Sequence, residues 1–457
     1  MSGLFGALGQ TTASMKAVER SIAAVQNNVA NVSTPGFAKM RHQPQADRFE
    51  PSDGVFGGVR PGDVISYRNQ FAEASVRERT SQWAKQQQAA GQMQRLEPVM
   101  SVSTDKGISG AIDRMFQSFS QLTVAPNDMS ARQIALDRAA EVGDSFRQAA
   151  GTLEGVRSQV DGELRTSVKR VNELASTIVE LNVAKRKNPP ASQGGAPDSG
   201  LDAAMNNALE ELSTYANFQS LEQGDGSVAI FLGGSRLLAI GDKTYPISLG
   251  NNGDSRAILD SEGADITSVV TGGGIGGQLE GHNQTIPSLQ NDLNALAESV
   301  AGEVNFALQG GADLDNATPG AELFSFDVTS GAARSLRTTG ITPRQLALAD
   351  PAQPGGNGNA LNLVEVGRRK QTNGYTFGES LGIVAGKLGR QLQDARGNIE
   401  LGTQLLTQAK AQRQADQGVS LDEEAALLVQ LQRSYQAAAQ LFRTLNEMTQ
   451  DVINMAR

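Results

Sequence analysis

The sequence predicts a mainly α-helical protein with an inserted β-rich domain, in which a long helical rod and coiled coil is built from both chain ends. Three observations lead to this expectation: heptad-spaced apolar residues at each end, long amphipathic stretches between them, and short β-type runs separated by glycine pairs. At 457 residues the chain is too long for one ordinary core, so several domains are expected.

The first segment carries apolar or small residues in unbroken steps of four and three. These are Leu4, Leu8, Thr11, Met15, Val18, Ile22, Val25, Val29 and Val32. Such spacing is typical of a coiled-coil seam. The helix should end at Ser33-Thr34-Pro35-Gly36, because proline restricts the residue before it and glycine permits a turn.

The C-terminal segment repeats this pattern with Leu427, Leu431, Ser434, Ala438, Leu441, Leu445, Met448, Val452 and Met455. Periodicity leaves two interpretations open: buried faces of a monomeric bundle, or helices that pair with each other and with neighbouring copies. Their position at the chain ends favours the second. We expect the interface to consist of Leu8, Met15, Val18, Ile22, Val25 and Val29 against Leu431, Leu441, Leu445, Met448 and Val452.

Between these ends, helical patterning predicts helices over 71–100, 107–123, 129–187, 200–216, 286–308 and 379–417. Short β-type runs at 227–232, 235–240 and 243–249 predict a meander. The expected domains are a terminal coiled-coil domain (1–45 and 418–457), a helical rod (46–216, 278–310 and 360–417), a β-rich outer insertion (217–277) and a loop-rich segment (311–359). The Pro- and Gly-rich stretch 187–197 is expected to be a surface loop.

Composition excludes several partners and chemistries. The net charge is −9 and no basic block occurs, which argues against nucleic-acid or anionic-membrane binding. Cysteine is absent, so disulfides and thiolate sites are not expected. The first residues lack a basic region and a continuous apolar core, so no cleavable secretory signal is expected, and no apolar run is long enough to span a membrane.

No catalytic, cofactor-binding or metal-binding residues are expected. His42 and His282 have no ligand spacing, and we expect both to be structural or exposed. The G-x-S-x-G match at 378–382 is interpreted as a helix start and the G-x-G-x-x-G match at 272–277 as a flexible joint. Trp83 should pack on its helix.

Polar residues near the helix ends have simple structural interpretations. The acidic run Asp422-Glu423-Glu424, with Ser420, should cap the last helix rather than act as an acid/base pair. Asn27, Asn28 and Asn31 should form hydrogen bonds to another chain or cap the end of the first helix.

Two motifs resemble a known family. The run Asn27-Asn28-Val29-Ala30-Asn31-Val32-Ser33-Thr34-Pro35-Gly36-Phe37 resembles the N-terminal signature of bacterial flagellar axial proteins. The run Ser420-Leu421-Asp422-Glu423-Glu424, followed by Leu431-Gln432-Arg433-Ser434-Tyr435, is similar to the C-terminal signature of the hook-associated protein 1 (FlgK) family. The close resemblance covers about 45 residues at each end. Phe37 stands where the family usually has tyrosine.

The resemblance implies a structural subunit at the hook–filament junction. Its implied partners are further copies of itself in a ring, the hook protein, a second junction protein (FlgL-like) and the export chaperone FlgN on the C-terminal helix. It also implies export through the flagellar type III apparatus and an extracellular location. Another rod- or hook-type axial protein, and an adhesin or hydrolase carried by the central insertion, remain alternatives.

Overall fold

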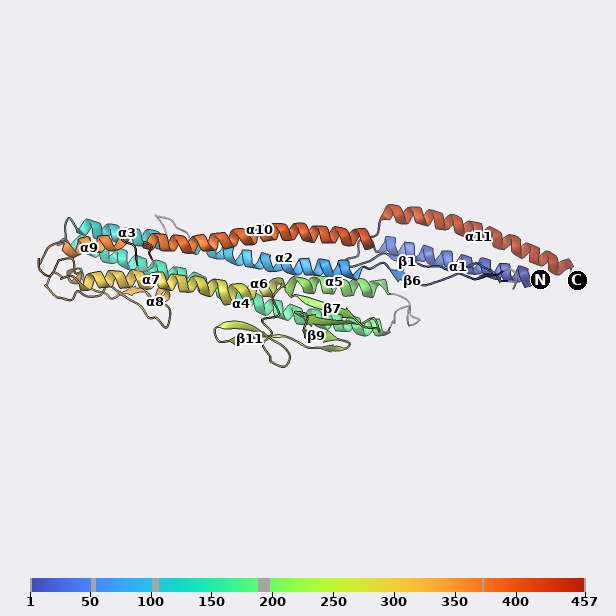
Figure 1. Cartoon of the computed structure of the whole chain (residues 1–457), viewed down its shortest axis with the longest axis horizontal. Helices are drawn as coiled ribbons and strands as arrows, with labels where there is room; N and C mark the ends of the chain where they lie inside the picture. The colour runs from blue at the N-terminus through green and yellow to red at the C-terminus, as the bar shows by residue number, and fades with distance from the viewer. Residues whose placement is uncertain (1, 51–54, 101–106, 188–197, 372–373, 456–457) are drawn as a thin grey trace.

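The computed structural model describes residues 2–50, 55–100, 107–187, 198–371 and 374–455. The molecule is an elongated rod, and the two chain ends lie together at one end of it (Figure 1). Helix α1 (Ser2–Ala30) and helix α11 (Leu421–Met455) run side by side and form this end. The expected helices at both ends of the chain are therefore present.

A two-stranded ribbon follows α1. Its strands pair as nested antiparallel couples, β1 with β6, β2 with β5 and β3 with β4. The bounds are β1 (Met40–His42), β2 (Gln45–Ala46), β3 (Phe49–Glu50), β4 (Val55–Phe56), β5 (Val59–Arg60) and β6 (Val64–Ser66). The described strands of the ribbon contact α1, whereas the expected division into domains placed residues from 46 onward in the helical rod. Strands of two or three residues are too short for a period to show in the sequence.

Six helices form the body of the rod, and their ranges confirm the helical predictions. They are α2 (Gln70–Leu96, continued by a 3-10 turn to Met100), α3 (Gly107–Leu122), α4 (Met129–Lys187), α5 (Ser199–Tyr215), α7 (Ile286–Gln309) and α10 (Phe377–Gln417). At 59 residues, α4 is about 90 Å long. Helices α2, α3, α5 and α7 pack against it, whereas α10 packs mainly on α2 (Figure 1).

The rod has a continuous apolar core. Along α4, Phe146, Val160, Leu164 and Ile178 are fully buried, as the helical stripe predicts. At the end away from the termini, the Phe377 ring stacks on Phe116 with 5.9 Å between centroids. The capping box formed by Thr376 and Glu379 begins α10 immediately before this contact, which confirms a helix start at the G-x-S-x-G match.

The β-rich region lies against one side of α4 (Figure 1). Four strands form an antiparallel sheet in the order β10-β9-β8-β7, and β11 pairs with β12 in a separate hairpin. The bounds are β7 (Phe218–Glu222), β8 (Val228–Leu232), β9 (Arg236–Ile240), β10 (Lys243–Thr244), β11 (Ser248–Asn252) and β12 (Ser255–Leu259). The sheet confirms a β meander at this position.

The glycine-rich run 272–277 is a helix, not a flexible joint. Helix α6 (Gly273–Glu280) is buried against α2 and continues through a π-helical turn (Gly281–Thr285) into α7. A Cβ at Gly277 would lie 2.5 Å from the Lys85 carbonyl oxygen, and one at Gly276 would lie 2.5 Å from that of Thr271. The glycines therefore serve close packing of α6 on its neighbours.

Residues 310–357 are mostly loop, as expected. They contain the strand pair β13 (Phe324–Ser325) and β14 (Arg337–Thr338), and the one-turn helix α8 (Ala332–Ser335). Helix α9 (Gly358–Arg368) then returns the chain to the rod, where it packs on α3 and α7.

Candidate functional site

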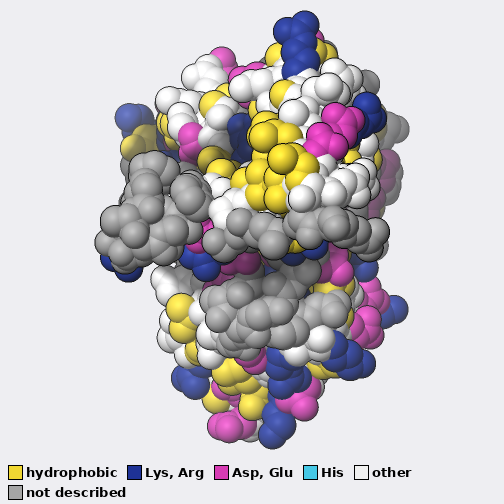
Figure 2. All heavy atoms as spheres, turned by 90° about the vertical axis from the view of Figure 1, so that its right-hand side faces the viewer, with side chains coloured by type: hydrophobic (Ala, Val, Ile, Leu, Met, Phe, Trp, Pro, Cys, Tyr) yellow, Lys and Arg dark blue, Asp and Glu magenta, His cyan; other side chains and the backbone are white. Residues whose placement is uncertain are grey.

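The candidate site is the pair of terminal helices, α1 and α11, together with the joint that connects them to the rod. The two helices contact each other along their length. The Tyr435 hydroxyl donates a hydrogen bond to Glu19 Oε1 at 3.2 Å. Near the free end, Leu4, Phe5, Thr449, Val452 and Ile453 line a small cavity of about 210 Å³. Figure 2 looks onto this end of the molecule and shows hydrophobic side chains gathered in its upper half.

The interface residues expected on α1 are covered unequally. Val25 is buried, and Leu8, Met15, Val18 and Ile22 are half-buried. Val29 lies exposed near the end of the helix. Most of the expected face of α1 is therefore covered, by α11 and by the ribbon that also contacts α1, whereas Val29 is left exposed.

The residues expected on α11 divide into two faces. Leu431 and Leu445 are half-buried, whereas Leu441 and Met448 are 54% and 50% exposed, and Val452 is also exposed. The covered positions include Glu424, Leu428, Leu431, Tyr435, Ala438, Phe442, Leu445 and Thr449, in steps of three and four, and also Leu427 and Ala439. At alternate positions of the seam, the residue that faces α1 is thus the one after the expected residue, such as Tyr435 instead of Ser434 and Phe442 instead of Leu441.

Chemistry explains why periodicity missed this rotation. Leu427 and Leu428 are both apolar, as are Leu441 and Phe442, so the apolar arc of α11 is wider than one partner helix covers. The excess arc carries Leu441 and Met448, which are exposed, whereas Val452 lines the cavity with Leu4 and Phe5 of α1. The terminal pair therefore has an apolar face that this chain does not bury.

A buried polar network fixes where α11 begins relative to α1. Glu424 is completely buried in the first turn of α11 and forms an ion pair with Arg41 at 2.8 Å. The Asn28 amide nitrogen donates to Glu424 Oε2 at 3.2 Å and to the Met40 carbonyl at 2.9 Å, and the Met40 N–H donates back to Asn28 Oδ1 at 2.8 Å. Asn28 therefore forms these hydrogen bonds within the chain, and hydrogen bonds to another chain stay a prediction.

The first turn of α11 also has the expected acidic residues. Asp422 and Glu423 lie in this turn with Glu424, where their charges complement the helix dipole. The Glu423 N–H lies 3.5 Å from the Ser420 hydroxyl, and Leu421 is exposed beside it. Helix capping explains Asp422 and Glu423, whereas the burial of Glu424 could not be read from the sequence.

The turn after α1 packs on the rod. Asn31 donates to Asn27 Oδ1 at 2.7 Å, and the Thr34 hydroxyl donates to Asn31 Oδ1 at 3.1 Å, which closes the helix end before Pro35. Gly36 has φ of +75°, and a Cβ there would lie 2.4 Å from the Ala203 carbonyl oxygen on α5. Only glycine satisfies both conditions. The half-buried Phe37 follows it.

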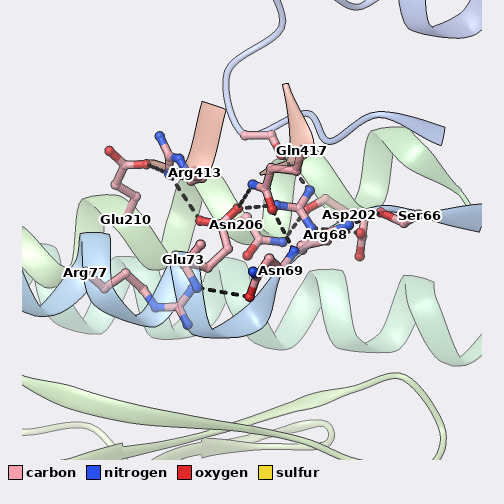
Figure 3. Close-up of polar contacts among 12 residues, drawn as sticks. Ser66, Arg68, Asn69, Glu73, Arg77, Asp202, Asn206, Glu210, Arg413 and Gln417 are labelled. Carbon is pink, nitrogen blue, oxygen red and sulfur yellow. Dashed lines mark hydrogen bonds and ion pairs between the residues drawn. The ribbon is translucent and has the colours of Figure 1, made fainter. Parts of the chain in front are cut away.

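An ion-pair cluster secures this turn to four rod elements (Figure 3). Arg68 donates to the Gly36 carbonyl at 2.7 Å and pairs with Glu73 of α2 at 2.6 Å. Glu73 is buried and also pairs with Arg413 of α10 at 3.1 Å, while Gln417 donates to it at 2.6 Å. The cluster therefore joins α2 and the end of α10 to the loop that carries the Thr-Pro-Gly-Phe motif.

Two carboxylates of α5 complete the cluster. Asp202 pairs with Lys185 at 2.6 Å and with Arg68 at 3.2 Å, and Glu210 pairs with Arg413 at 2.7 Å. Burial alone would raise the pKa of Asp202, but the positive charges of Lys185 and Arg68 outweigh it and hold that pKa below its ordinary value. Arg413 likewise holds the pKa of Glu210 below its ordinary value against the effect of burial. Both groups therefore favour the folded joint when ionised.

Sequence reasoning missed Arg68, Glu73 and Arg413. No local pattern marks them, because they are scattered over 345 positions and converge only when α2, α5 and α10 pack together. A usable signal was present in Glu73, an acidic residue on a stripe of α2 that is otherwise small and apolar.

Trp83, His42 and His282, which were considered for ligand or metal binding, form hydrogen bonds with other residues of the protein. The Trp83 Nε1–H donates to the Thr403 hydroxyl at 3.1 Å, across the contact between α2 and α10. His42 Nδ1 lies 2.9 Å from the Ser21 hydroxyl, and burial lowers the pKa of both His42 and His282. In the described part of the chain, no three His, Asp or Glu side chains gather in a way that could hold a metal ion. None of the helices within the described ranges is long and apolar enough to cross a membrane.

The fold and this interface define a class: an elongated helical structural subunit whose paired terminal helices leave apolar surface uncovered. The sequence model of the flagellar hook-associated protein FlgK helical domain matches residues 93–324, just over half of the chain, and that of the flagellar basal body rod FlgEFG protein C-terminal region matches residues 412–455. The chain belongs to the flagellar hook-associated protein FlgK family.

Individual relatives agree with this assignment. Flagellar hook-associated protein 1 of Bacillus subtilis (strain 168) is 24% identical over 99% of this chain and 99% of its own length. That of Salmonella typhimurium is 23% identical over 72% of this chain and 62% of its own length. The structure of the flagellar hook junction protein FlgK from Burkholderia pseudomallei superposes with a TM-score of 0.65 at 16% identity, and covers 76% of this chain and all of that one.

The family assignment confirms the function expected from the terminal motifs. The chain is a structural protein of the hook–filament junction of the bacterial flagellum, not an enzyme. It assembles with axial components of the flagellum such as the hook and other junction proteins.

Proposed function

We propose that the terminal pair is the assembly element, and that its uncovered apolar face packs on neighbouring subunits in a ring between the hook protein and a FlgL-like junction protein. The observation that carries this proposal is the division of the α11 heptads into a face that contacts α1 and a face with Leu441 and Met448 exposed. Exposed apolar residues at heptad spacing are stabilised when another helix covers them.

The test is a matched pair of serine substitutions on α11. Leu441→Ser combined with Met448→Ser removes the uncovered face, whereas Val429→Ser changes a residue of similar exposure (49%) that lies roughly a third of a turn around the helix from them. In a strain without the wild-type gene, we expect the double variant to be folded and soluble but to leave hooks without filaments, as scored by electron microscopy. We expect Val429→Ser to assemble normally. Normal filaments with the double variant would contradict the proposal.

We also propose a division into domains, based on which segments of the chain pack together. Residues 1–45 and 418–457 form the terminal domain, the helical segments form the rod, and 217–277 forms an outer β-rich insertion. The contacts of the ribbon strands with α1 support an extension of the N-terminal part of this domain from residue 45 to residue 66. Limited proteolysis of the purified chain checks this, because the peptide 40–66 should be released together with the terminal helices and not with the rod.

We also propose that the exported chain retains its first residues and that the chaperone FlgN holds α11 before export through the type III apparatus. The half-covered state of α11 supports this, since a helix with an open apolar face needs a partner before assembly. Truncation after residue 417 should abolish co-purification with FlgN, with Val429→Ser as the control that retains it. Mass spectrometry of the secreted chain should find an intact N-terminus.

A further inference from the structure

The four-stranded sheet has two edges of different character. The β10 edge is two residues long, carries Lys243 and is followed by Pro246, which are features that prevent pairing with another strand. The β7 edge is five residues long, Phe218-Gln219-Ser220-Leu221-Glu222, and contains neither lysine nor proline. Only one edge of this sheet is therefore protected.

The backbone of β7 presents open hydrogen-bonding groups. The Asn217 carbonyl accepts from Gly233 and the Gln223 N–H donates to Ser227, so the odd-numbered residues of this strand face β8. Because successive residues of a strand alternate in direction, the N–H and C=O groups of Phe218, Ser220 and Glu222 point away from β8. Among the described residues, none forms a backbone hydrogen bond with these groups.

A groove lies along this edge, and α2 forms its opposite wall. Arg77 donates across it to the Ser220 hydroxyl at 3.3 Å, and Gln70 hydrogen-bonds to Glu222 near the other end of the strand. The groove has a volume of about 1350 Å³. That volume exceeds the roughly 300–1,000 Å³ of sites for small molecules, so the space suits a segment of polypeptide.

The groove wall has one cation without an acidic partner. Arg68 and Lys85 each form an ion pair with a carboxylate. Arg77 has no carboxylate within 4.0 Å in the described residues, and burial lowers its pKa. Phe71 stands at the rim of the groove and is 89% exposed. An occupant would therefore gain from a carboxylate near Arg77 and an apolar group near Phe71.

The groove is continuous with the joint of the terminal pair. Tyr67, Arg68 and Asn69, which hold the loop after α1 and the end of α10, also line it. A subunit that packs on the terminal pair would therefore lie next to the groove. This position favours a donor from the assembled structure over a free ligand.

We propose that the β7 edge is an assembly site, which receives an extended, carboxylate-bearing segment of a neighbouring axial subunit as a fifth strand of the sheet. The main-chain groups of Phe218, Ser220 and Glu222 pair with this segment, and Arg77 binds its carboxylate. This inference rests on the assembly proposed above, because a neighbouring subunit in that assembly supplies the added strand. The test below distinguishes a failure of strand pairing from a failure of the assembly role of the terminal pair.

Hydrogen exchange of the full chain, free and in isolated hook–filament junctions, tests the pairing directly. We expect hydrogen exchange at the amides of Phe218, Ser220 and Glu222 to be slowed by about tenfold or more in the junction. The β8 amides should be protected in both states. Unchanged exchange at these amides in correctly assembled junctions would overturn the inference and leave the role of the terminal pair intact. Protection that appears already in the free chain as its concentration rises would also overturn it, because the donor would then be β7 of a second copy.

Variants supply a second readout. Ser220→Pro removes an outward N–H without removing a bond to β8, and edge strands tolerate proline at such positions. Arg77→Gln removes the unpaired charge. Leu221→Ala is the control, because Leu221 is an exposed residue of the same strand that does not line the groove, and the change leaves every outward N–H in place. We expect Ser220→Pro and Arg77→Gln to reduce incorporation into junctions, measured by immunogold counts, and Leu221→Ala to leave it unchanged. Full incorporation of folded Ser220→Pro would contradict the proposal.

Discussion

The rod and the terminal pair are built from the same helical material but bury it to different extents. In α4, 19 of 59 residues are buried, whereas in α11 only Glu424 and Thr449 of 35 residues are. Since burial of apolar surface is the main favourable term in folding, the rod is stable by itself, and the terminal pair gains most of its stability from what it contacts. We therefore expect the rod to be stable within the single chain and the terminal pair to be stabilised further by contacts with other subunits.

The largest expected effect breaks the rod. Phe146→Ala removes a fully buried side chain from the core of α4, and we expect it to lower the free energy of unfolding by about 3–5 kcal/mol. Trp83 is the only tryptophan and lies at the contact of α2 and α10, so its fluorescence in a denaturant titration reports on the rod. An effect below about 1 kcal/mol would mean that the rod core is not the source of stability.

The next effect separates the two regions. Glu424→Ala leaves Arg41 without its partner and removes the acceptor of Asn28, which should cost the terminal pair about 1–3 kcal/mol. We expect faster proteolysis within α11, with no change in the unfolding of the rod that Trp83 reports. Asp422→Ala, an exposed neighbour in the same turn, is the control. Equal loss of rod stability would show that the two regions unfold as one.

A glycine pair tests the joint between them. Gly36→Ala forces a side chain into a left-handed conformation and against the Ala203 carbonyl, so we expect it to loosen the joint at a cost of about 1–3 kcal/mol. Gly9→Ala has open space in α1 and should stabilise that helix by about 1 kcal/mol. Small-angle scattering should detect a changed angle between terminal pair and rod for Gly36→Ala alone. The same profile for both variants would exclude a role of Gly36 in the joint.

The smallest expected effect is a dependence on pH. The folded pKa values of Asp202 and Glu210 are lowered, so their contribution to stability is present above their unfolded pKa values and is lost as the pH falls through the folded ones. We expect the joint to weaken below about pH 4. Asp202→Asn should flatten this dependence, measured as the rate of proteolysis in the loop 31–39 between pH 7 and pH 3. An unchanged slope would assign the acid sensitivity to other groups.

Much of the fold was predictable because its signals are local. The stripe of α4, the boundary at Thr376 and the glycine-separated strands of the meander follow from periods and capping residues within a few turns of the chain. The ribbon 40–66 was not predictable, since its strands have two or three residues each and hold together only by pairing with each other and with α1.

The candidate site divides in the same way. Heptad spacing identified the helices that pair, but not the rotation that exposes Leu441 and Met448, because neighbouring positions are equally apolar. The motif Thr34-Pro35-Gly36 identified a turn, but not that Ala203 and Arg68 require a glycine there. Contacts between residues distant in sequence decided both.

The amino-acid sequence by itself determined the long helices, the position of the β-rich insertion and the two heptad-patterned ends, since these depend on the chemistry of residues close along the chain. The tertiary structure decided which apolar positions of α11 are covered, how Glu73 and Arg413 meet, and which edge of the sheet stays open. These features depend on the packing of separate elements, and packing selects one arrangement among several that the local pattern permits equally well.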